Sequence, residues 1–245
     1  MRETVGKIST KQNLSSETLF HFTSSLDVLT AIFETGFQAR YVYEKIPGTK
    51  LAYFVRCVCF CDIPLGAVKW HLNWYGNYGI GLNRPWAKKN NITPVTYIHT
   101  KTPFIKRSSS KATQESLKVN PITPYLKQIK GKQYFWDTKN NEEYWKWKKF
   151  YEEREWRFLP IENGLFIQKY QKENELEVLR QKLNKNNNNH PLLKFERKDI
   201  EYIIIKDKVE LYSIIQQIRK IIKNKREQDK MISKVLPSIQ IIRDF

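Results

Sequence analysis

Cysteine is scarce in this chain. Three of its 245 residues are cysteines, and Cys57, Cys59 and Cys61 occupy alternate positions of one apparent strand. An odd count at this spacing argues against a disulfide framework. A zinc site would need a fourth ligand and favours a turn between its cysteines. The sequence therefore predicts reduced, buried thiols and no metal site.

Long apolar runs are also missing. No stretch approaches the roughly 18 apolar residues of a membrane helix, and the charged N-terminus lacks the apolar core of a signal peptide. We therefore expect a cytoplasmic protein with no membrane partner.

Phosphate-binding glycine motifs are absent as well. Gly76, Gly79 and Gly81 are closely spaced, but no Lys-Ser/Thr follows them and no G-x-G-x-x-G pattern precedes a helix. These glycines favour a turning or closely approached strand, and nucleoside-triphosphate and Rossmann sites are excluded.

Positive charge is abundant. The chain has 43 Lys plus Arg against 25 acidic residues, a formal net charge of +18. Such an excess favours a polyanion such as nucleic acid as partner, although richness in Lys and Asn is also typical of AT-rich genomes. Residues 101–150 hold 12 basic residues against 4 acidic ones, interleaved with Trp and Tyr. This mixture suits a groove for single-stranded nucleic acid, or equally a helical insertion that buries an aromatic stripe.

The chain reads as one domain with an insertion. Hydrophobic content of 40% is enough for a packed core. We predict a flexible lead-in over residues 1–17, a single domain over 18–223 with the insertion at about 101–150, and a basic tail over 224–245 whose end, Ile239 to Ile242, can return to pack. Within the domain, the patterns predict a charged helix in 170–190, a buried strand over 200–205 and an amphipathic helix from Lys208.

The stretch 19–37 organises the N-terminal part. Residues 19–23 alternate, with Leu19, His21 and Thr23 on one side, as in a half-buried strand. Residues 25–35 then change to helical spacing. Ser24 or Ser25 can cap the start of this helix and Gly36 can close it.

This opening resembles that of the ADP-ribosyltransferase superfamily, in particular the poly-ADP-ribose polymerase branch. The resemblance implies an NAD pocket in which His21 holds the adenosine ribose and Thr23 helps to seat the nicotinamide amide. Arg40 follows the helix as a further cofactor-binding candidate, and residues 43–52 would form a loop over the bound dinucleotide. The alternative is that His21 is an ordinary core residue.

A second part of the resemblance lies in residues 55–75. Cys59-Phe60-Cys61-Asp62 is similar to the strand that leads to a nicotinamide-stacking tyrosine in the polymerases. Tyr75 or Tyr78 would supply that aromatic face. A plain aromatic core is the alternative.

The third element is the acidic stretch 151–160. If it forms one strand, Glu153, Glu155 and Arg157 lie on one face. They are then either a surface ion-pair ladder or a catalytic glutamate with its orienting partner. The resemblance implies that Glu155, or else Glu153, stabilises the positive charge that develops as nicotinamide leaves.

Together, the motifs at 19–23, 59–64, 71–81, 94–95 and 153–157 are similar to the AbiGi type of abortive phage-resistance proteins over roughly residues 18–215. The two resemblances imply an α+β fold with a split mixed or antiparallel sheet of the ADP-ribosyltransferase type. They imply an NAD-dependent mono-ADP-ribosyltransferase, a glycosyl-transfer enzyme, that modifies nucleic acid or a nucleic-acid-bound protein. The alternative is a non-catalytic antitoxin that binds a partner protein of a toxin–antitoxin pair. A metal-dependent nuclease ranks last, because no convincing carboxylate cluster is present.

Overall fold

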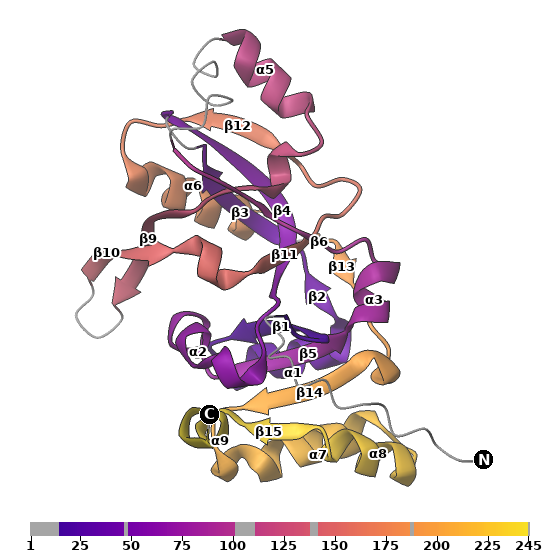
Figure 1. The fold of residues 1–245 in the computed structure, drawn as a ribbon. Coiled ribbons are helices and arrows are strands. Elements are labelled where there is room, and N and C mark those ends of the chain that lie inside the picture. The colour runs from indigo at the N-terminus through magenta and orange to yellow at the C-terminus, as the bar shows by residue number, and fades with distance from the viewer. Residues whose placement is uncertain (1–14, 47–48, 101–110, 138–141, 187–188, 245) are drawn as a thin grey trace.

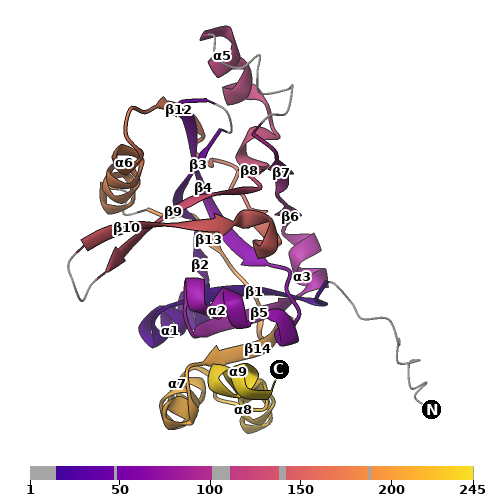
Figure 2. The ribbon, with the colours of Figure 1, turned by 60° about the vertical axis from the view of Figure 1, so that its left-hand side comes forward.

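A computed structural model describes residues 15–46, 49–100, 111–137, 142–186 and 189–244 (Figure 1). Its centre is β4 (Leu51–Cys61), whose residues are almost all buried because they are nearly all apolar. β4 belongs to a sheet with nine strands among the described residues. The second half of β4 pairs with β1 (Thr18–Thr23) and β11 (Glu155–Phe158), and the first half pairs with β3 (Arg40–Lys45) and β12 (Phe166–Lys169) (Figures 1 and 2).

The main path of the sheet is almost entirely antiparallel. The one parallel neighbour pair on this path is β14–β15. From one edge to the other the strands are β15 (Val235–Pro237), β14 (Ile200–Ile205), β5 (Tyr78–Asn83), β1 (Thr18–Thr23), β4, β11 (Glu155–Phe158) and β6 (Thr93–Pro94).

The remaining strands attach around this path. β3 (Arg40–Lys45) and β12 (Phe166–Lys169) pair with the first half of β4. The other described pairs are β2 (Phe37–Gln38) with β13 (Leu192–Leu193), β7 (Thr96–Ile98) with β8 (Leu126–Gln128), and β9 (Lys130–Asp137) with β10 (Glu142–Lys149).

Helices cover both faces of the β14–β5–β1 part of the sheet. One face packs against α1, α3, α7 and α8, and the other against α2 and α9, whereas α6 lies against β3 (Figure 1). The described helices are α1 (Leu26–Thr35), α2 (Lys69–Tyr75), α3 (Arg84–Lys89), α5 (Lys111–Val119), α6 (Glu173–Asn186), α7 (Leu211–Ile221), α8 (Lys225–Ile232) and α9 (Ser238–Asp244). None of the helices in the described part of the chain has the length and apolarity that a membrane crossing requires.

The predicted opening of the chain is confirmed. β1 covers the alternating residues, and α1 follows it directly. The Ser25 hydroxyl accepts a hydrogen bond from the backbone N–H of Val28 at 3.3 Å. Gly36 ends the helix with a φ of 97°, a conformation that glycine adopts without the steric penalty of a side chain. β14 and α7 likewise coincide with the strand and helix that were predicted near residues 200 and 208.

The predicted loop over residues 43–52 is wrong. β3 continues to Lys45 and β4 begins at Leu51, so the two strands form a hairpin in which Tyr43 pairs with Phe54. Runs of aromatic and β-branched residues on both sides of Pro47-Gly48 favour strands over a long loop, and the two turn residues themselves lie outside the described part. The described residues of this stretch are therefore mostly strand residues.

Two other segments also differ from their sequence-based descriptions. The residues marked as a basic tail form α8, β15 and α9, although the burial of Ile241 in α9 against the sheet agrees with the packing expected for Ile239 to Ile242. The described part of the 101–150 insertion is mostly strand, since α5 is followed by β8, β9 and β10. Of the predicted lead-in over residues 1–17, residues 1–14 lie outside the described residues.

The predicted fold class is confirmed at the level of a mixed α+β protein with a mostly antiparallel sheet. Its notable feature is the weak connection between β1 and β4. A single residue pair, Phe20 with Cys61, joins them, whereas β1 pairs with β5 along six residues. The two strands therefore diverge, and the space between them is lined by side chains of both.

Candidate functional site

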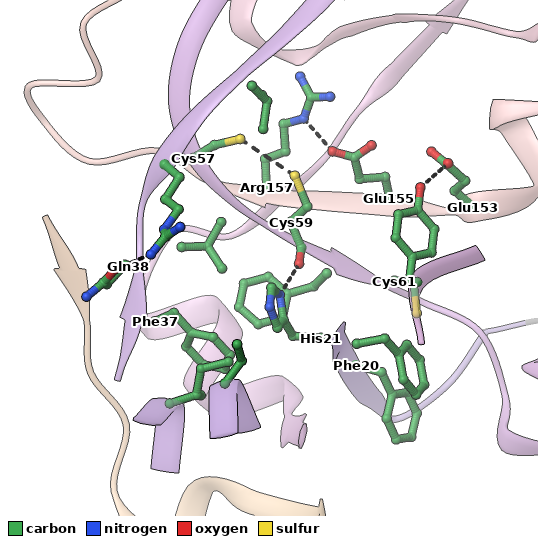
Figure 3. Close-up of a pocket in the computed structure, with 18 of the residues that line it drawn as sticks. Phe20, His21, Phe37, Gln38, Cys57, Cys59, Cys61, Glu153, Glu155 and Arg157 are labelled. Carbon is green, nitrogen blue, oxygen red and sulfur yellow. Dashed lines mark hydrogen bonds and ion pairs between the residues drawn. The ribbon is translucent and has the colours of Figure 1, made fainter. Parts of the chain in front are cut away.

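A cavity of about 570 Å³ opens where β1 and β4 diverge (Figure 3). Its size is within the range usual for small-molecule sites. Phenylalanines line one end, together with His21 and the first helix. Charged side chains line the other end, and these are Glu44, Lys127, Glu153, Glu155 and Arg157.

His21 is held firmly at the apolar end. Its Nδ1 lies 2.8 Å from the carbonyl oxygen of Cys59, and its ring makes edge contacts with the rings of Phe37 and Phe60. Burial lowers the pKa of His21, so the ring is neutral near pH 7. Because a carbonyl oxygen can only accept, Nδ1 carries the proton and Nε2 remains a hydrogen-bond acceptor.

Tyr75 comes to the charged end from the C-terminus of α2. Its hydroxyl donates to Glu153 and accepts from Lys148 Nζ at 2.9 Å. The ring lies 4.5 Å from the ring of His71, and Lys148 Nζ lies 4.1 Å from the Tyr75 ring centre. Tyr78 is oriented differently: its hydroxyl donates to Glu210 at 2.6 Å and it packs in the main core. Between the two tyrosines, Tyr75 is therefore the one at the cavity.

The two glutamates do not lie on one strand face, and that prediction is wrong. Glu153 ends a short 3-10 turn, Arg154 has a left-handed φ of 46°, and β11 begins at Glu155. The left-handed residue breaks the alternation that the sequence suggests. Both carboxylates nevertheless turn toward the cavity, and Arg157 keeps the predicted position on the same strand face as Glu155 (Figure 3).

Buried ion pairs connect these carboxylates. Glu155 binds Arg157 Nε at 2.6 Å and also Lys127. Lys127 Nζ lies 2.6 Å from Glu153 and 3.3 Å from Glu44. The set, which we call the charge cluster, has three carboxylates and three cations: Glu44, Glu153 and Glu155 with Lys127, Lys148 and Arg157.

The cluster keeps both candidate glutamates ionised. Burial by itself would raise the pKa of Glu155, but the charges of Arg157 and Lys127 outweigh it and hold the pKa well below its usual value. Burial likewise opposes ionisation of Glu153, and Lys127 and Lys148 lower its pKa. Neither carboxyl is therefore a proton donor near pH 7. Their charges are available to stabilise a developing cation.

Sequence reasoning missed Glu44, Lys127 and Lys148. Glu44 fell in the predicted loop, and the two lysines fell in the basic insertion, where neighbouring lysines look the same. The available signal was the run Tyr41-Val42-Tyr43, since aromatic and β-branched residues favour a strand, and a strand directs Glu44 to the side of β3 opposite Tyr43.

The other candidate cofactor residues are less central. Arg40 lines the cavity and donates to the side chain of Gln38 at 2.9 Å. Thr23 pairs with Tyr78 at the end of β1 and is not among the lining residues of the described cavity. Gly76, directly after α2, lies so close to the backbone of β1 that a Cβ there would be 2.3 Å from the carbonyl oxygen of Thr23. This contact places α2, and hence Tyr75, beside β1.

The cysteines are free. Cys57 and Cys59 lie with their sulfur atoms 3.6 Å apart, and Cys57 and Cys61 are buried. Burial raises the pKa of the Cys61 thiol well above its usual value. Within the described ranges, His, Cys, Asp and Glu form no group of three or more that could hold a metal ion.

His71 makes the stability of the fold depend on pH. Burial lowers the pKa of this ring to about 4. Between pH 6.5 and pH 4 the unfolded chain binds a proton that the folded chain excludes, so stability falls as the pH falls through this window. For this one group the loss between pH 7 and pH 5 is about 2 kcal/mol.

The difference is measured by urea denaturation at pH 7 and pH 5. We expect the His71→Gln variant to lose about 2 kcal/mol less than the unmodified protein over this interval. Equal losses in the two proteins would show that His71 is accessible to protons in the folded state.

The fold and the cavity define a mixed α+β protein with a small-molecule-sized site next to a buried charge cluster. A family model described as "Putative abortive phage resistance protein AbiGi, antitoxin" matches residues 49–206. The chain therefore belongs to the AbiGi family of abortive phage-resistance proteins, and the predicted family is confirmed. The match includes Tyr75, Glu153 and Glu155, whereas His21 precedes it.

A curated relative extends the similarity to most of the chain. The chain is 27% identical, over 249 residues, to the abortive phage resistance protein AbiGi of Lactococcus lactis subsp. cremoris. The alignment covers 86% of this chain and 100% of that protein. No solved structure matches the chain.

Proposed function

We propose that this member of the AbiGi family is an NAD-dependent ADP-ribosyltransferase whose NAD site is the cavity between β1 and β4. One observation carries the proposal. His21, Tyr75 and Glu155, which were chosen from three separate stretches of the sequence, line the same cavity. They come from three different elements, β1, α2 and β11. A surface ion-pair ladder on one strand would not bring three such elements to one cavity.

The apolar end is suited to the adenosine part of NAD. Nε2 of His21 is oriented by the bond at Nδ1 and can accept a hydrogen bond from a ribose hydroxyl. Phe20, Phe22 and Phe37 provide apolar surface around it. Arg40 at the same cavity supplies a positive charge for the pyrophosphate.

The charged end is suited to bond cleavage. In the proposed reaction the bond between C1′ of the nicotinamide ribose and the pyridinium nitrogen breaks, and the nitrogen takes the electron pair as neutral nicotinamide leaves. C1′ becomes positively charged, and the ionised carboxylate of Glu155 stabilises it electrostatically. An acceptor oxygen or nitrogen then bonds to C1′ and loses its proton to solvent.

Release of nicotinamide tests this proposal. Purified protein is incubated with NAD, and nicotinamide is measured with water as acceptor and with added nucleic acid or protein acceptors. We expect release that depends on intact protein and label transfer from adenine-labelled NAD to an acceptor. A protein that binds no NAD and releases no nicotinamide under any of these conditions contradicts the proposal.

A second candidate function is that of a non-catalytic antitoxin. Two observations favour it. The family is described as an antitoxin. The charge of the Glu155 carboxylate is already balanced by Arg157 and Lys127. In that case the protein would bind a partner protein encoded by a neighbouring gene. Co-purification with that gene product, unchanged by NAD and by Glu155→Gln, would support the antitoxin function.

A further inference from the structure

The strand β10 presents two different faces. Lys148 is buried and its Nζ lies 2.7 Å from Glu153 in the charge cluster. The residues on either side of it point the opposite way, because side chains alternate along a strand. Trp147 is 69% exposed, and Lys149 is exposed as well. At residues 147–149, one face of β10 therefore contributes Lys148 to the charge cluster, and the other face meets solvent.

The neighbouring strand β9 extends this outer face. Trp147 is paired across the strands with Lys132, and Lys149 with Lys130. Directly paired residues share a face of a two-stranded ribbon, so one tryptophan and three lysines stand together. Lys130 and Lys132 are both exposed. Among the carboxylates whose side chains the structure describes, none lies within ion-pair distance of either lysine.

A hollow of about 400 Å³ adjoins this face. Two aromatic rings and several basic side chains line it, together with one acidic residue, Glu173. The charge of Glu173 is already paired with Lys45 at 3.0 Å. The hollow is therefore lined by both positively charged and aromatic side chains. The lining residues that matter here are Lys45, His99, Lys130, Lys132, Trp147 and Tyr170.

We propose that this outer face of β9–β10, with the adjoining hollow, binds single-stranded nucleic acid. Lysines hold the phosphates, and the exposed ring of Trp147 stacks on a base. A double helix keeps its base faces inside its own stack, so it cannot use the tryptophan in this way. The surface is separate from the NAD cavity, and the proposal does not depend on NAD binding.

Binding is measured by fluorescence anisotropy with a labelled 12-nucleotide oligothymidylate, its RNA counterpart and a duplex of the same length. We expect the single strands to bind more tightly than the duplex. The Trp147→Ala variant should bind the single strand about tenfold or more weakly, because one base loses its stacking partner. In Lys130→Glu/Lys132→Glu, the slope of log affinity against log salt should be less steep by about 1.4, for two lost phosphate contacts.

Matched controls separate this site from general attraction to a basic protein. Trp70 is 77% exposed on α2, so Trp70→Ala removes a comparable ring from another surface. Lys220→Glu/Lys223→Glu makes the same change of charge near the end of α7, where both lysines are exposed. We expect both controls to bind the single strand nearly as the unmodified protein does. NAD binding should be unchanged in Trp147→Ala, which distinguishes this proposal from that for the cavity.

Three results would overturn the proposal: tighter binding of the duplex, equal losses in the variant and control proteins, or no saturable binding of either single strand.

Discussion

Replacement of Arg157 by methionine is expected to destabilise the folded protein by about 3–5 kcal/mol, the usual cost of leaving a buried charge without its partner. The Arg157 side chain is 1% exposed. Its guanidinium donates to Glu155 at 2.6 Å, to Glu44 at 2.5 Å and to the hydroxyl of Tyr53 at 2.7 Å. Methionine fills similar space but leaves both carboxylates short of a cation.

Urea denaturation at pH 7 measures this effect. Lys149→Met is the matched control, because Lys149 pairs with Glu152 at 3.1 Å and both side chains are largely exposed. Exposed pairs contribute little, so the midpoint of the control should hardly move. If Arg157→Met unfolds at nearly the same urea concentration as Lys149→Met, the charge cluster does not stabilise the fold.

The second large effect is expected at Glu155. Replacement by glutamine should lower nicotinamide release by about 10²–10³-fold, the usual result of removing one preorganised electrostatic contact to a transition state. The Glu155 carboxylate is fixed by Arg157 and Lys127, so its charge needs no reorganisation during the reaction. Glu153 contacts the hydroxyl of Tyr75 and Lys148, and its expected role is to position the tyrosine.

Glu153→Gln is therefore the matched control. Each variant removes one carboxylate from the same buried cluster, so their losses of stability should be similar. We expect Glu153→Gln to keep much more activity than Glu155→Gln, with thermal melting showing that both are folded. Turnover that persists in Glu155→Gln would rule out the assignment, and equal losses of activity in both variants would point to structural damage.

Local signals in the sequence were sufficient for much of the fold. The alternation of residues 19–23, the cap at Ser25 and the glycine at Gly36 are all short-range features, and the structure agrees with each. The same holds for β14 and for the apolar stripe of α7. These elements form where local preference and burial favour the same conformation.

The errors occurred where distant parts of the chain decide the outcome. Lys127 and Glu155 are neighbours in space but lie on β8 and β11, and nothing near Lys127 distinguishes it from the exposed lysines around it. Arg154 adopts a left-handed conformation that no pattern signals for arginine. The tail was given no regular elements, whereas β15 adds a parallel strand to β14, which is a long-range pairing.

The site residues could be named only in part. His21 and Tyr75 were found because the motifs around them resemble a known family, and the structure places both at the cavity. Thr23 and Tyr78 carried the same resemblance. They pair with each other at the ends of β1 and β5, and Tyr78 points into the main core. Spacing along the sequence did not reveal which of these side chains face the cavity between β1 and β4.

Calorimetric titration of the purified protein with NAD tests the proposed cavity site most directly. The unmodified protein should bind NAD saturably, and His21→Ala should lose that binding, because His21 is the oriented acceptor at the apolar end of the cavity. His190→Ala, which changes a histidine outside the lining residues, should bind as the unmodified protein does. Absence of binding in the unmodified protein, or full binding in His21→Ala, would contradict the proposed NAD site.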